Sequence, residues 1–112
     1  MNNSISKKEY PQGKDFIFTI FDDTDVATVE YIKPIYDFLT HLGLVTTKTV
    51  WPLSCSEKTP YDGSHTLEDE KYAQYIQELS QRGYEIGYHG ASMCTNKRDQ
   101  IIYSFEKYYE IF

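Results

Sequence analysis

The sequence has no segment typical of a membrane protein and no basic tract typical of a nucleic-acid-binding protein. No stretch approaches the roughly 20 apolar residues of a membrane-spanning helix, and residues 1–15 lack the apolar region of a signal peptide. Lys and Arg never occur in a run longer than two, and 17 acidic against 11 basic residues give a formal net charge of -6. Such a surface repels phosphate backbones. We therefore predict a cytoplasmic protein with no membrane span and no nucleic-acid partner.

Cysteine is scarce as well. Cys55 and Cys94 are the two cysteines of the chain, and their spacing matches neither a CxxC pair nor the dense framework of a small secreted domain. The prediction is two free, buried thiols, which fits a reducing compartment. Hydrophobic residues, in contrast, make up 40% of the 112 residues and aromatic residues 16%, which is enough for the core of one small domain.

Apolar periodicity predicts three strands that alternate with three helices, after a flexible polar tail over residues 1–15. Thr66 is expected to be the N-cap of the second helix, and Gly43 and Gly83 are expected to close the first and second helices. Pro34 should kink or restart the first helix. The predicted strands are 16–21, 46–53 and 84–88, and the predicted helices are 28–42, 66–82 and 96–112.

Acidic residues directly follow the first predicted strand, and a histidine follows the third. Asp22, Asp23 and Asp25 come after the run FTIF, and His89 comes after YEIGY. The alternating order predicts an α/β fold with a parallel sheet and right-handed crossovers. The C-terminal ends of parallel strands meet at one edge, where α/β folds place their sites. We therefore expect the acids and His89 to lie near one another, although acids alone would also suit a solvated turn.

The stretches FTIFDDTD and RGYEIGYHG, with DGSHTLEDE between them, resemble the N-terminal part of the polysaccharide deacetylase family, also called the NodB-homology family. The resemblance covers about residues 16–92. It implies that residues 16–112 are the N-terminal part of a deformed (β/α) barrel. It also implies a metal-dependent hydrolase that removes an N-acetyl or related acyl group from a saccharide, such as a precursor in surface-glycan synthesis.

The family motifs imply roles for individual residues. Asp22 corresponds to the catalytic base that takes a proton from water. Asp23 and His89 correspond to ligands of a divalent metal, which would be zinc, with cobalt or nickel as alternatives. Trp51 and Tyr61, near the end of the second strand and in the loop after it, are candidates for stacking on the sugar ring, with packing as their alternative role.

One metal ligand of the family pattern is missing. The position four residues after His89 carries a histidine or an acid in the family, but here it is Met93, whose thioether suits a zinc-type cation poorly. The substitutes that lie near this position or in neighbouring loops are Asp25, His65, Cys94 and Asn96.

Later motifs of the family have no room before Phe112, and a barrel needs roughly 200 to 250 residues. The expectation is a truncated piece of a longer protein that is inactive alone. Its first and third strands would have unpaired edges, which could also pair in a homo-oligomer.

Two other functions stay open. Met93 favours a non-catalytic relative that binds a glycan or a protein partner. The run DTDVAT at 23–28 comes within one residue of the DxDxT motif of haloacid dehalogenase-type phosphatases, but Thr28 falls one place late and that fold does not explain EIGYHG. Metal binding distinguishes the deacetylase from its non-catalytic relative.

Overall fold

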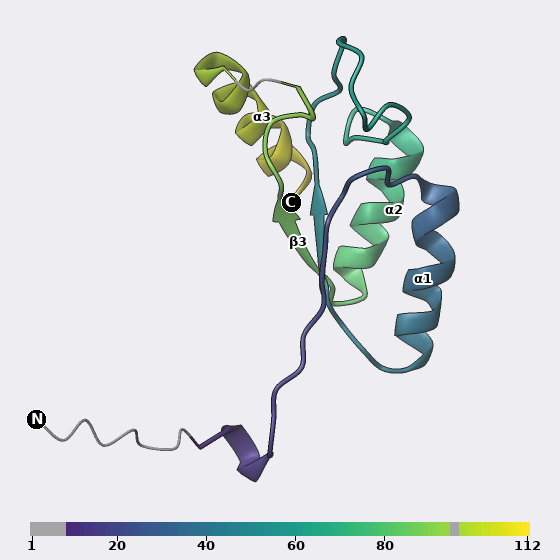
Figure 1. Cartoon of the computed structure of the whole chain (residues 1–112), viewed down its shortest axis with the longest axis vertical. Helices are drawn as coiled ribbons and strands as arrows, with labels where there is room; N and C mark the ends of the chain where they lie inside the picture. The colour runs from purple at the N-terminus through teal and green to yellow at the C-terminus, as the bar shows by residue number, and fades with distance from the viewer. Residues whose placement is uncertain (1–8, 95–96) are drawn as a thin grey trace, which may run out of the picture.

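Three short parallel strands form the sheet, in the order β1-β2-β3. The computed structural model describes residues 9–94 and 97–112, and Figure 1 shows how their elements are arranged. Phe21 pairs with Thr47, and Thr47 in turn pairs with Glu85. The elements are η1 (a 3-10 turn, Pro11–Gly13), β1 (Phe21–Asp22), α1 (Val29–His41), β2 (Thr47–Val50), α2 (Glu70–Gln81), β3 (Glu85–Tyr88) and α3 (Arg98–Ile111).

The helices α1 and α2 each connect two neighbouring strands. Right-handed crossovers that progress in one direction along a sheet place their helices on the same face. Figure 1 shows α1 and α2 side by side, as this rule requires. The α/β class and the parallel βαβαβα order predicted from the sequence are confirmed for the described residues.

Apolar stripes on the two helices build the core. The buried residues of these helices are Ile32, Tyr36 and Leu39 on α1 and Tyr72, Tyr75, Ile76 and Leu79 on α2. Thr28 caps α1 by accepting a hydrogen bond from the Tyr31 amide, and Gly43 follows the helix with a φ of 69°. Pro34 lies inside α1, which continues through it instead of restarting.

The first strand is shorter than the predicted range 16–21. β1 comprises Phe21 and Asp22, and the Thr47 amide adds one more bond, to the carbonyl of Ile20. Because β2 begins opposite Phe21, it offers no partner to the residues before Ile20. Phe16 and Phe18 are consequently 75% and 69% exposed, and Figure 1 shows this segment running away from the sheet. Strand-forming residues make a strand only where a neighbour pairs with them.

The second and third helices start later than the predicted positions. The N-cap of α2 is Asp69 and not Thr66, since the Asp69 carboxylate accepts a hydrogen bond from the Tyr72 amide at 2.9 Å. Thr66 lies in the preceding turn, where its carbonyl accepts a hydrogen bond from the Asp69 amide. The predicted start of the third helix, Asn96, lies outside the described residues, and α3 begins at Arg98.

The helix α3 lies beside β3. The Tyr108 hydroxyl donates a hydrogen bond to the carbonyl of Ile86, and the ring of Phe105 stacks on that of Tyr88 with 4.3 Å between centroids. In Figure 1, α3 and the pair α1 and α2 lie on opposite sides of β3. The edge of the third strand, which the sequence predicted to be bare, is therefore partly covered, and this weakens the case for a homo-oligomer through that edge.

Two further predictions concern the tail and the membrane. The described part of the tail, residues 9–15, is exposed and contains η1. Among the helices of residues 9–94 and 97–112, none combines the length and the apolar composition needed to cross a membrane.

Candidate metal centre

The loop after β1 is shaped by hydrogen bonds to a second loop. The Ala27 amide donates to the Thr24 carbonyl and so closes a turn over these residues. Val26 has a φ of 57°, which is rare for a β-branched residue, and its amide donates to the hydroxyl of Ser64 at 2.8 Å. The His65 amide donates to the Ala27 carbonyl at 2.8 Å. The loop that carries Asp23 and Asp25 is thus held in a strained but well-defined conformation.

Three side chains at the C-terminal edge of the sheet converge here. The Nε2 atom of His89 lies 2.9 Å from Oδ1 of Asp23, and the same oxygen accepts a hydrogen bond from the Asp25 amide at 3.4 Å. Ligand atoms of Asp23, Asp25 and His89 all lie within 4.8 Å of one another. The backbone of His89 is anchored because its amide donates to the Val50 carbonyl at 3.0 Å. The predicted proximity of the acids and His89 is present for Asp23 and Asp25.

Asp22 points away from this group of three. Successive side chains of a strand alternate between the two faces, so Asp22 and Asp23 face opposite ways. The Oδ2 atom of Asp22 accepts a hydrogen bond from the Tyr36 hydroxyl at 2.8 Å and lies 3.2 Å from Nζ of Lys48. The predicted base is therefore already engaged by a tyrosine and a lysine on the helix-covered side.

Burial governs the ionisation of the two partners of Asp22. Loss of hydration raises the pKa of the Tyr36 hydroxyl, and the neighbouring Asp22 carboxylate raises it further. Burial lowers the pKa of Lys48, while the Asp22 carboxylate opposes that shift. The sequence analysis missed Lys48; the signal for it was a lone lysine within the predicted strand TTKTV.

The two aromatic candidates lie beside His89. The ring of Trp51 meets the His89 ring edge-on, with 5.3 Å between centroids, and the Tyr61 ring lies 5.9 Å from Trp51. Trp51 is only 3% exposed, so its face is not open to a sugar ring. It packs against His89 instead, while the half-buried Tyr61 remains the candidate for stacking.

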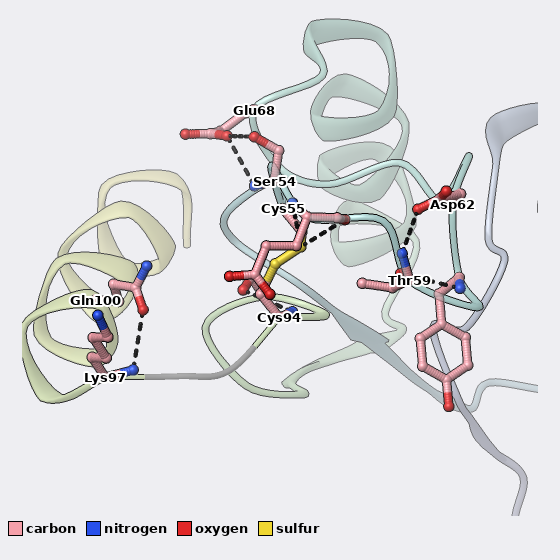
Figure 2. Close-up of a disulfide and its surroundings, with 11 residues drawn as sticks. Ser54, Cys55, Thr59, Asp62, Glu68, Cys94, Lys97 and Gln100 are labelled. Atoms are coloured by element: carbon pink, nitrogen blue, oxygen red, sulfur yellow. Dashed lines mark hydrogen bonds between the residues drawn. A yellow bond between two sulfur atoms is a disulfide. The ribbon is translucent and has the colours of Figure 1, made fainter.

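The prediction of two free thiols is wrong, because Cys55 and Cys94 form a disulfide with 5.5 Å between their Cα atoms. Figure 2 shows it joining the loop after β2 to the segment after β3, with Ser54 and Glu68 nearby. Each cysteine follows a different strand, and parallel pairing brings those strand ends together, which spacing alone could not reveal. Disulfides persist in oxidising compartments, so the thiol argument for a cytoplasmic location no longer holds, and that location stays an untested prediction.

The described substitutes for the missing metal ligand differ in their distance from Asp23 and His89 and in their other contacts. Cys94 is engaged in the disulfide. The Nδ1 atom of His65 accepts a hydrogen bond from the Val29 amide at 3.4 Å, at the start of α1. Asn96 lies outside the described residues. Among the substitutes considered, Asp25 is the one that the structure brings beside Asp23 and His89.

The arrangement of Asp23, Asp25 and His89 is the main indication of function, because comparisons with known proteins found no relative. No protein-family model, no curated protein and no solved structure matches this chain.

Proposed function

We propose that this chain carries the metal centre of a metal-dependent hydrolase that removes an N-acetyl or related acyl group from a saccharide. The observation that supports it is the convergence of Asp23, Asp25 and His89 at the edge of a parallel sheet. The resemblance of the FDD and EIGYH motifs to polysaccharide deacetylases supplies the reaction and the substrate class. The sequential strand order, with α1 and α2 on one face, is compatible with part of a (β/α) barrel.

The three donor groups suit a divalent cation. Two carboxylates and one imidazole are a ligand set used for zinc and for other first-row divalent metals, with cobalt and nickel as alternatives to zinc. Two negative charges balance those of the ion. When bound, such a metal polarises an acyl carbonyl and lowers the pKa of water. The half-buried Tyr61 would contact the sugar, and Trp51 would fix the orientation of His89.

Asp22 is the proposed base. Tyr36 and Lys48 hold its Oδ2 atom, and the side chain is 35% exposed, so it keeps contact with water. Its side chain faces the opposite way from that of Asp23, so in this role Asp22 would have to turn toward the metal to take a proton from the attacking water.

The contacts of Asp22 also favour a second candidate. A carboxylate that is held by a buried lysine and a tyrosine is often structural, because the buried ammonium group needs it as a partner. In that case the chain would bind a glycan or a partner through its metal centre without hydrolysing it. Met93, at the position of the missing ligand, agrees with this alternative.

Acetate release from a panel of N-acetylated oligosaccharides, measured on the native protein with zinc, separates the two candidates. We expect Asp22→Asn to reduce the rate by about 100-fold or more while zinc still binds. Asp23→Ala should abolish both hydrolysis and binding. Lys33→Met, on the exposed side of α1, is the control and should change neither.

Zinc binding without acetate release in the unmodified, full-length native protein would reject the hydrolase in favour of the binding domain. An unchanged rate in Asp22→Asn would show that Asp22 is not the base.

A further inference from the structure

Lys48 is a charged side chain enclosed next to the metal centre. It lies in β2, the middle strand, and is 0% exposed. An ammonium group loses its hydration on burial, which is unfavourable unless partners compensate. The partners of Nζ are Oδ2 of Asp22 at 3.2 Å and the carbonyl oxygen of Asp23 at 3.5 Å. Lys48 therefore binds the last residue of β1 and the residue that follows it.

These contacts give Asp22 and Asp23 different surroundings. The Asp22 carboxylate forms an ion pair with Lys48 on the helix-covered side of the sheet. The bond to the Asp23 carbonyl fixes the backbone of the next residue, whose carboxylate faces the opposite way, toward His89. Thr49 adds to this restraint from the same strand, since its hydroxyl donates to the Asp22 carbonyl at 2.8 Å.

We propose that Lys48 is a positioning residue of the metal centre. Its ammonium group holds Asp22 and the Asp23 carbonyl, and thereby keeps the Asp23 carboxylate beside His89. Asp22 is kept out of the ligand set by the same contact. The metal part of this inference rests on the proposed function, whereas the restraint on the end of β1 is a property of the metal-free chain.

If Lys48 only stabilised the core, its loss would lower the melting temperature without changing the affinity or the geometry of a bound metal. If Lys48 positions the ligands, its loss should change both. Tyr84→Phe is a suitable control, because the Tyr84 hydroxyl bonds to Thr40 and to the Tyr36 carbonyl within the core. Removing it costs stability without removing a contact made by Asp22 or Asp23.

The test compares Lys48→Met and Tyr84→Phe by two measurements. The first is cobalt affinity together with the visible spectrum of bound cobalt, which reports the coordination geometry. We expect Lys48→Met to bind cobalt about 10- to 100-fold more weakly and with an altered spectrum. The second is amide hydrogen exchange of residues 22–27 in the metal-free chain, which should accelerate in Lys48→Met but not in Tyr84→Phe.

A second variant guards against misfolding of Lys48→Met. The double variant Lys48→Met/Asp22→Asn leaves no unpaired charge in the core and still lacks the ammonium group on the Asp23 carbonyl. It should show the same faster exchange and weaker cobalt binding. Wild-type affinity, spectrum and exchange in the double variant would overturn the inference.

The two proposals fail separately. Faster exchange at residues 22–27 in a chain that binds no cobalt would reject the metal centre and retain the restraint by Lys48. Unchanged exchange and cobalt binding in both Lys48 variants would reject the role of Lys48 and retain the metal centre.

Discussion

Tyr75 carries a buried hydroxyl group that has no hydrogen-bond partner among the described residues. An unpaired buried hydroxyl costs stability, so Tyr75→Phe should raise the free energy of unfolding by about 1 kcal/mol. Tyr84→Phe, which removes a hydroxyl with two partners, should lower it by about 1 kcal/mol. Urea denaturation of both variants measures the difference. Equal destabilisation by the two changes would mean that the Tyr75 hydroxyl has a partner.

The site could be predicted only in part at the scale of single residues. Asp23 and His89 follow strands whose C-terminal ends lie at the same edge of the parallel sheet, so their proximity could be inferred from the pattern. The orientation of Asp22 depends on which face of β1 the helices cover, and on Lys48 and Tyr36, which lie far from it in sequence. Asp25 joins the group through a loop in which Val26 has a positive φ, and no sequence signal predicts this conformation.

At the scale of elements, capping residues decide where the helices begin. Two candidate caps, Thr66 and Asp69, precede the stripe of α2, and the structure uses the one nearer to it. Asp69→Ala should therefore lower the free energy of unfolding by about 1 kcal/mol, because the Tyr72 amide loses its acceptor. Asp69→Ser should restore most of this loss, and thermal unfolding followed by circular dichroism measures both. No loss in Asp69→Ala would contradict the assigned cap.

The first helix was easier to predict than the first strand. A helix makes its hydrogen bonds within its own segment, so the apolar stripe of α1 and the expected stop at Gly43 sufficed to place it. A strand exists only against a neighbour, and FIFTIF meets β2 only at its last residues. Local pattern therefore predicted too long a first strand.

At the scale of the whole molecule, the disulfide constrains the unfolded chain. Cys55 and Cys94 are 39 residues apart, and closing a loop of this size stabilises a protein by about 3 to 4 kcal/mol in the chain-entropy account. Reduction should lower the free energy of unfolding by about that amount. The double variant Cys55→Ser/Cys94→Ser should match the reduced protein and be insensitive to reductant. An oxidised protein whose stability does not respond to reductant would contradict the disulfide.

The α/β class follows from the alternation of elements along the chain, whereas the disulfide follows from the pairing of β2 with β3. Both the disulfide and the contact of Tyr108 on α3 with Ile86 on β3 join segments that are distant in the sequence. These features depend on three-dimensional contacts that local periodicity does not encode.

The most direct test of the central claim is the zinc affinity of the purified chain, measured by titration calorimetry beside His89→Ala. Our account predicts one zinc ion per chain in the wild type and a loss of at least about 100-fold in affinity in the variant. Lys33→Met, at an exposed ion pair on α1, should bind as the wild type does. Equal zinc affinity in the wild type and in His89→Ala, or no binding in either, would contradict a metal centre formed by Asp23, Asp25 and His89.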